Sequence, residues 1–268
     1  MKKTLSVLYG LGAYLLFLGA YLYLVAFSLN LAPHSLSSRA TATPWRAALI
    51  DIGLVTIFGL QHSIMARPGF KRAWTRVVPA HLERSTFVLI ATAMVVLIVV
   101  AWQPIDGVIW NISSPMGAVI IGISIAGWLS VPGVSLLTDH FALFGLRQVY
   151  EHATGRRTSP PEFKERMVYK SVRHPMMLAF IVAMWATPLM TSGHLLFAGL
   201  MTSYILIGIH FEERDLAKAH GRDYREYQQR VPKLLPLGTR PPRSAREIAA
   251  TIRMRSRLTA DPLPMVEG

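Results

Sequence analysis

The sequence of 268 residues contains no cysteine. Without a thiol, the chain can form no disulfide, offer no thiolate to a metal ion and carry out no covalent thiol chemistry of its own. Charged residues are also scarce, at 16% of the chain, whereas 52% of the residues are hydrophobic. This composition is too apolar for an ordinary water-soluble domain and indicates a polytopic membrane protein.

A glycine-rich phosphate loop is missing as well, since Gly10-Leu11-Gly12 lies inside an apolar run and follows no strand. The formal net charge is +13, which in a soluble protein would suggest a nucleic-acid partner. Here the basic residues lie between the apolar runs, where they favour contact with anionic lipids. We therefore expect membrane lipids as partners and no nucleic acid.

Four apolar stretches are long enough to cross a bilayer, because a helical span needs about 20 apolar residues. These stretches are Leu5 to Leu29, Trp45 to Met65, Ser85 to Trp102 and Met116 to Leu137. Two shorter ones follow, Met176 to Met190 and Leu195 to His210, and are predicted to form a helical hairpin. The expected fold is all-α: a polytopic transmembrane helical bundle of four long spans plus a C-terminal hairpin, with a cytoplasmic cofactor-binding region.

The basic residues alternate between the segments that join the spans. Five lie from Arg67 to Arg84, seven from Arg147 to Arg173 and twelve after His210, whereas the loop from Gln103 to Pro115 has none. Segments rich in lysine and arginine face the cytoplasm in membrane proteins. We predict an integral protein of a bacterial cytoplasmic (inner) membrane with both termini in the cytoplasm.

The chain divides by composition into three regions. Residues 1–138 form the four-span region, residues 139–240 hold a cytoplasmic loop, the hairpin and the cofactor-binding region, and residues 241–268 form a basic tail. After the hairpin, Gly221 is expected to end the helix. A short helix capped by Asp223 is then expected to place Tyr224, Tyr227 and Val231 on one face.

Two polar clusters flank the hairpin, at residues 169–175 and 211–216, and should therefore meet at one membrane face. Arg173, together with the positive end of a helix that begins at Pro175, favours an anionic group such as a carboxylate. The two glutamates of the second cluster could bind an ammonium group or ribose hydroxyls. Alternatively, these arginine and glutamate residues simply mark the membrane boundary.

The C-terminal part of the chain shows a characteristic order of motifs: Arg173-His174-Pro175-Met176, the hairpin, the acidic run 212–216, then Gly221, Tyr224, Tyr227, Val231 and Pro236. This order resembles the C-terminal half of the isoprenylcysteine carboxyl methyltransferase superfamily. Members of that superfamily are integral-membrane enzymes in which this region binds S-adenosylmethionine. The superfamily usually has Tyr and Gly where this chain has Met177 and Ala179. The resemblance implies an S-adenosylmethionine site made of Tyr169, Arg173, His174, Pro175, Glu212, Glu213, Arg214 and Tyr224.

Three further segments point to a narrower group. Residues 58–68, 139–150 and 180–198 are similar to the NnrU-like branch of the superfamily, and within it to the methanethiol S-methyltransferases. Those enzymes convert methanethiol to dimethyl sulfide. The resemblance implies a methyltransferase whose substrate is a small thiol, most simply methanethiol.

A thiol reacts as its thiolate, and the pKa of free cysteine, about 8.5, lies above neutrality. A base or proton path is therefore wanted near the transferred methyl group. His140, beside Asp139, is the first catalytic candidate, and His62 and Arg147 are the others. Either histidine could instead be a structural hydrogen-bonding residue between helices. No two histidines share the spacing of a helical zinc pair, so no metal site is expected.

Two alternatives remain open on the sequence. The acceptor could be a larger thiol or a carboxylate, and an additional unpaired arginine at the site would favour a carboxylate. The chain could also be a non-catalytic NnrU-like membrane protein that binds a ligand or partner, in which case it would not bind S-adenosylmethionine.

Overall fold

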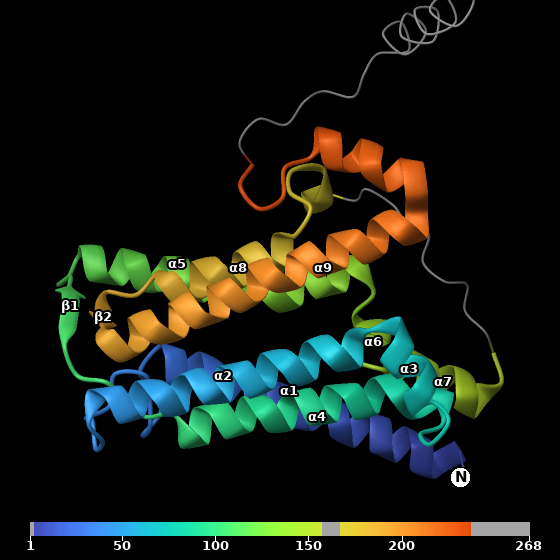
Figure 1. Ribbon diagram of the computed structural model, residues 1–268, viewed down its shortest axis with the longest axis horizontal. Helices are drawn as coiled ribbons and strands as arrows, with labels where there is room; N and C mark the ends of the chain where they lie inside the picture. The colour runs from blue at the N-terminus through green and yellow to red at the C-terminus, as the bar shows by residue number, and fades with distance from the viewer. Residues whose placement is uncertain (1–2, 157–166, 237–268) are drawn as a thin grey trace, which may run out of the picture.

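The computed structural model describes residues 3–156 and 167–236, which form a bundle of helices lying along one common direction (Figure 1). Five of its helices are long and apolar enough to cross a membrane. They are α1 (Lys3–Ser28), α2 (Pro44–Ala66), α4 (Ala80–Ala101), α5 (Met116–Thr138) and α9 (Ser192–Arg230). The four spans predicted from the apolar runs are confirmed, and only the start of α4 lies appreciably earlier than expected.

The helices form two groups that share one core. Helix α1 packs on α4 and α4 on α2, while α5 packs on α8 (Pro175–Trp185) and α8 on α9. Contacts between α2 and α9 join the groups. Large buried side chains fill the interior between them, among them Phe27, Trp102, Trp128, Phe197 and Ile205.

The predicted hairpin is confirmed, but its first arm is shorter than expected. Helix α8 ends at Trp185, not at Met190, and at 1.5 Å per residue it covers only about 16 Å. Pro188 explains the early end, because a proline disfavours the helical conformation of the residue before it. The chain runs on in an extended conformation into strand β2 (Leu189–Thr191).

A two-stranded antiparallel sheet, which was not predicted, joins β2 to β1 (Val108–Asn111). The indole Nε1 of Trp110 also donates a hydrogen bond of 2.9 Å to the carbonyl oxygen of Thr187. The pairing fastens the tip of the hairpin to the loop between α4 and α5.

The opposite end of the bundle carries the short elements (Figure 1). They are α3 (Pro68–Trp74), α6 (His140–Leu143), α7 (Leu146–Thr154) and the 3-10 helix η1 (Met167–Lys170). Gly145 lies here against the start of α4 with φ +86°, and a Cβ on it would come within 2.6 Å of the Ser85 backbone nitrogen. Only glycine allows so close an approach with this backbone conformation.

Helix α9 bends sharply at Gly221, whose φ of 56° and ψ of −120° are not helical. The predicted stop at this glycine is confirmed. Beyond it, Tyr224, Tyr227 and Val231 are buried together, as the spacing predicted, and pack against Leu216. The short second helix therefore folds back on the end of the first (Figure 1).

The division into regions at residue 138 remains a description of the sequence. Helices from both sides of this boundary pack together, because α5 lies along α8 and α2 contacts α9. The predicted basic tail, residues 241–268, lies outside the described residues.

Candidate functional site

A cavity of about 480 Å³ opens at the end of the bundle that carries the short elements. Its wall comes from both helix groups. Helix α3 and the start of α4 lie on one side, the start of α8 and the part of α9 at Glu212 lie on the other, and α6 and α7 lie between them. The lining residues are Lys71, Glu83, Arg84, Thr138, Asp139, Ala142, Leu143, Gln148, Tyr169, Arg173, His174, Pro175, Met176, Met177 and Glu212. The two polar clusters that flank the hairpin both reach this cavity.

Pro175 is the first residue of α8, where its missing N–H leaves no hydrogen bond unmade. The two residues before it are fixed by the segment that follows α9. The backbone N–H of Arg173 donates to the carbonyl of Pro232 at 2.9 Å, and that of His174 donates to Lys233 at 3.1 Å. The chain after α9 therefore supports the start of α8.

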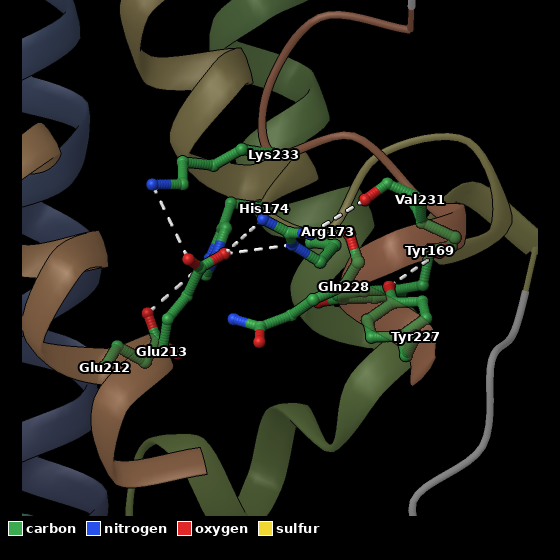
Figure 2. A network of polar contacts seen from close by, with 9 residues as sticks. All are labelled: Tyr169, Arg173, His174, Glu212, Glu213, Tyr227, Gln228, Val231 and Lys233. Carbon is green, nitrogen blue, oxygen red and sulfur yellow. Dashed lines mark hydrogen bonds and ion pairs between the residues drawn. The ribbon is translucent and has the colours of Figure 1, made fainter. Parts of the chain in front are cut away.

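The side chains of Arg173 and Glu213 bind each other (Figure 2). The guanidinium contacts Glu213 Oε1 at 2.8 and 2.9 Å, and its Nη1 donates to the carbonyls of Gln228 and Val231 at 2.6 and 2.9 Å. Lys233 Nζ lies 3.5 Å from the other carboxylate oxygen. Only 8% of the Arg173 side chain and 11% of that of Glu213 are exposed. The two charges therefore neutralise each other within the protein, and neither side chain is free to bind a ligand.

Glu212 is the accessible member of the next contact, with the buried His174. His174 Nε2 donates to Glu213 at 3.2 Å, and its Nδ1 lies 3.6 Å from Glu212 Oε2. The Glu212 side chain is 50% exposed and lines the cavity. The hydroxyl of Tyr169, also on the wall, lies 3.1 Å from Thr138 Oγ1.

The remaining predicted cofactor residues lie off the cavity wall. Arg214 is exposed. Tyr224 is buried in the second helix, with its ring beside that of Tyr227. The hydroxyl of Tyr227 donates to the carbonyl of Tyr169 at 2.7 Å, so this cluster holds Tyr169 in place.

His140 is buried between helices, and both of its ring nitrogens have partners. Nε2 lies 2.7 Å from the hydroxyl of Tyr14, and Nδ1 lies 2.8 Å from Ser135 Oγ. Burial lowers the pKa of His140 from its usual value. Its neighbour Asp139 is the residue that reaches the cavity, where it accepts a hydrogen bond from the Ala142 backbone and forms an ion pair with Arg147. Arg147 is therefore connected to the cavity by its ion pair with Asp139, which lines the wall.

His62 lies in α2 among aromatic rings. The ring centroids of Phe87, Phe58 and Tyr204 are 4.8, 5.5 and 6.3 Å from that of His62. Its Nδ1 is buried and has no hydrogen-bond partner in the described part of the chain. Phe87 also contacts Arg84, whose guanidinium carbon lies over the Phe87 ring, 4.8 Å from its centroid.

Three charged residues of the wall were missed by sequence reasoning: Lys71, Glu83 and Arg84. Their only sequence signal is position, since they lie in or beside the basic segment before the third apolar run. A charge at such a place usually marks a membrane boundary. Across residues 3–156 and 167–236, no group of three or more His, Asp or Glu side chains could hold a metal ion.

A family model described as NnrU protein matches residues 49–238, which include every element of the cavity wall. The chain belongs to the NnrU family. A similar protein is methanethiol S-methyltransferase 1 of Bradyrhizobium diazoefficiens, 43% identical over 87% of this chain and 83% of the relative. The methanethiol S-methyltransferase of Mycobacterium tuberculosis is 44% identical, over 88% of this chain and 98% of the relative.

Human nurim is a more distant relative of this NnrU protein, 29% identical over 62% of this chain and 66% of its own length. No solved structure matches the chain.

Proposed function

We propose that this protein is an integral-membrane methyltransferase that converts methanethiol to dimethyl sulfide with S-adenosylmethionine as the methyl donor. The observation that carries the proposal is the identity of 43–44%, over almost the whole folded chain, to relatives named methanethiol S-methyltransferase. A cavity with both acidic and basic groups at the junction of the two helix groups supports it.

The residues of the cavity fit the proposed cofactor. The cavity volume of about 480 Å³ falls within the range of sites for small ligands, about 300–1,000 Å³. Glu212 is exposed enough to accept hydrogen bonds from an ammonium group or from ribose hydroxyls. Tyr169 and His174 add polar contacts beside it. When bound, S-adenosylmethionine supplies a methyl group that is electrophilic because it is attached to a sulfonium.

The other predicted cofactor residues act on this cavity indirectly. Arg173 and Glu213 hold the segment after α9 against the start of α8, and Tyr224 packs in the cluster that positions Tyr169. Arg214 is exposed and has a weaker case for direct contact.

The apolar part of the wall suits the acceptor. Ala142, Leu143, Met176 and Met177 line the cavity, and an apolar surface excludes water from a reacting thiolate. A small volatile thiol can reach it through the bilayer. His140, Arg147 and His62 stay the candidates for proton handling near the methyl group. Of the two histidines, His62 has a ring nitrogen without a partner among the described residues.

The orientation in the membrane follows from the basic residues. Lys71 and Arg84 lie at the cavity end, as do Arg147 and Arg173, while the loop with β1 has no basic residue. The positive-inside rule then places the cavity and both termini on the cytoplasmic side of a bacterial inner membrane, where S-adenosylmethionine is available.

Headspace gas chromatography tests the proposal directly. Detergent-purified protein is given S-adenosylmethionine and methanethiol, with heat-treated protein as the control, and dimethyl sulfide above the control is expected. Binding of S-adenosylmethionine without product would reject methanethiol and point to a larger thiol or a carboxylate. Absence of both would reject the enzyme in favour of a non-catalytic ligand-binding protein.

A further inference from the structure

Arg84 presents a guanidinium to the cavity that forms no ion pair within the described part of the chain. It lies in the first turns of α4 and lines the cavity, yet it forms no ion pair with any residue of the ranges 3–156 and 167–236. Glu83 lines the same wall, but no contact within ion-pair distance joins the two. A partly buried guanidinium is costly when unpaired, so its position indicates an anionic ligand group.

The guanidinium is held in a fixed orientation. Its Nε donates a hydrogen bond of 2.6 Å to the carbonyl of Leu143, and its plane lies over the ring of Phe87. Leu143 is itself held in place, because its backbone N–H donates to the carbonyl of Asp139 at 2.8 Å. The two terminal nitrogens of Arg84 make no hydrogen bond to the described residues, which leaves the geometry that binds a carboxylate through two parallel hydrogen bonds.

Arg173 is the contrasting case. Its Nε and Nη2 contact Glu213 and its Nη1 donates to two backbone carbonyls, so little capacity remains for a ligand. Among the described residues, the cavity therefore has one well-positioned arginine with open donors, on α4, and one saturated arginine, just before α8. Lys71 on α3 is a second cation on the side of Arg84.

We infer that Arg84 binds the carboxylate of the methyl donor's amino-acid group, with Lys71 as a neighbouring positive charge. This inference rests on the proposed function, since it assigns one end of S-adenosylmethionine. Glu212, on the opposite wall, is then available for the ammonium group or the ribose. An unpaired arginine could also serve a carboxylate acceptor, but with Arg173 occupied Arg84 is needed for the donor.

A comparison of two ligands against three proteins tests the assignment. The ligands are S-adenosylmethionine and its decarboxylated analogue, and the proteins are the wild type, Arg84→Gln and the matched control Arg76→Gln. Arg76 is an exposed arginine of the same basic segment. Affinities are measured by isothermal titration calorimetry in detergent, and the thermal midpoint of each variant confirms folding.

Arg84→Gln is expected to weaken S-adenosylmethionine about 10- to 100-fold, because a hydrogen bond to a charged group contributes that much. The decarboxylated analogue should bind the wild type and Arg84→Gln equally, and Arg76→Gln should match the wild type throughout. If Arg84→Gln unfolds, Arg84→Lys gives the same test with a smaller loss, since it keeps the charge but not the paired geometry.

Equal weakening of both ligands would overturn the inference, because Arg84 would then act only on the shape of the cavity. Unchanged affinity for S-adenosylmethionine would overturn it too, and a loss of phosphatidylglycerol binding in that case would assign Arg84 to a lipid phosphate. A wild-type protein that binds neither ligand would remove the proposed function together with the assignment.

Discussion

Arg173 and Glu213, forty residues apart, close a buried ion pair at 2.8 Å on the boundary of the cavity. The pair joins the start of α8 to α9, and through Gln228 and Val231 it also holds the segment after α9 (Figure 2). The ion pair therefore stabilises the folded structure of the site. Glu212, the residue before Glu213 and the other partner of His174, keeps a half-exposed carboxylate on the cavity wall.

Glu213→Ala should lower the free energy of unfolding by about 3 kcal/mol or more, because it leaves the buried Arg173 without its countercharge. Glu212→Gln should leave stability nearly unchanged, since its side chain is half exposed, and should weaken S-adenosylmethionine binding instead. Unfolding in detergent, followed by tryptophan fluorescence, and calorimetric titration measure the two effects. Equal stability of both variants would contradict this division of roles.

His62→Gln should lower the rate of dimethyl sulfide formation about 100-fold or more if the imidazole takes the thiol proton, because general-base catalysis contributes factors of that order. S-adenosylmethionine affinity should not change. The rate of the wild type should rise with pH, and that of the variant should recover in part at high pH, where the free thiolate is abundant. A variant with wild-type rate and pH profile would exclude His62 as the base.

His140 makes the folded state sensitive to acid. Since burial holds its pKa below the usual 6.5, the unfolded chain binds more protons, and stability should fall as pH drops through about 6.5. His140→Gln should show a smaller loss of thermal midpoint between pH 7.5 and pH 5.5. The free energy of unfolding of this variant at neutral pH should also be lower by about 1–3 kcal/mol, because the hydrogen bonds of the imidazole to Tyr14 and Ser135 are lost. Identical pH dependence in both proteins would contradict the prediction.

Gly221→Ala should destabilise the bend in α9 by about 1 kcal/mol or more, because a φ of 56° is unfavourable for a residue with a Cβ. There is open space around the position, so the cost comes from the backbone alone. Gly221→Asn should cost about as much, because asparagine tolerates the left-handed helical region with a ψ near +47° but not a ψ of −120°. Limited proteolysis after the bend, compared between each variant and the wild type, provides the measurement, and wild-type cleavage of both variants would argue against backbone strain.

The spans and the bend were predictable because they depend on local signals. Apolar runs of sufficient length fix α1, α2, α4 and α5, and a glycine between two helical patterns marks the turn at Gly221. The β1–β2 pair was not predictable in this way. Its strands lie far apart in the chain, and short extended segments beside apolar spans carry no clear alternation.

The polar clusters were predicted to meet, and they do, but the sequence could not show which charges bind each other. Arg173 and Glu213 were expected to face a ligand, and the fold brings them within hydrogen-bond distance of one another. Arg84 was missed for a related reason. Its proposed role depends on its having no ion pair with a carboxylate of the described residues, and spacing along the chain contains no such information.

The β1–β2 pair has a mechanical consequence for the whole bundle. It fastens the ends of α5, α8 and α9 that lie farthest from the cavity. Backbone hydrogen bonds therefore hold the end of α8 and the first turns of α5 and α9 together on the side opposite the cavity, and this pairing keeps the three helices in register along the bundle.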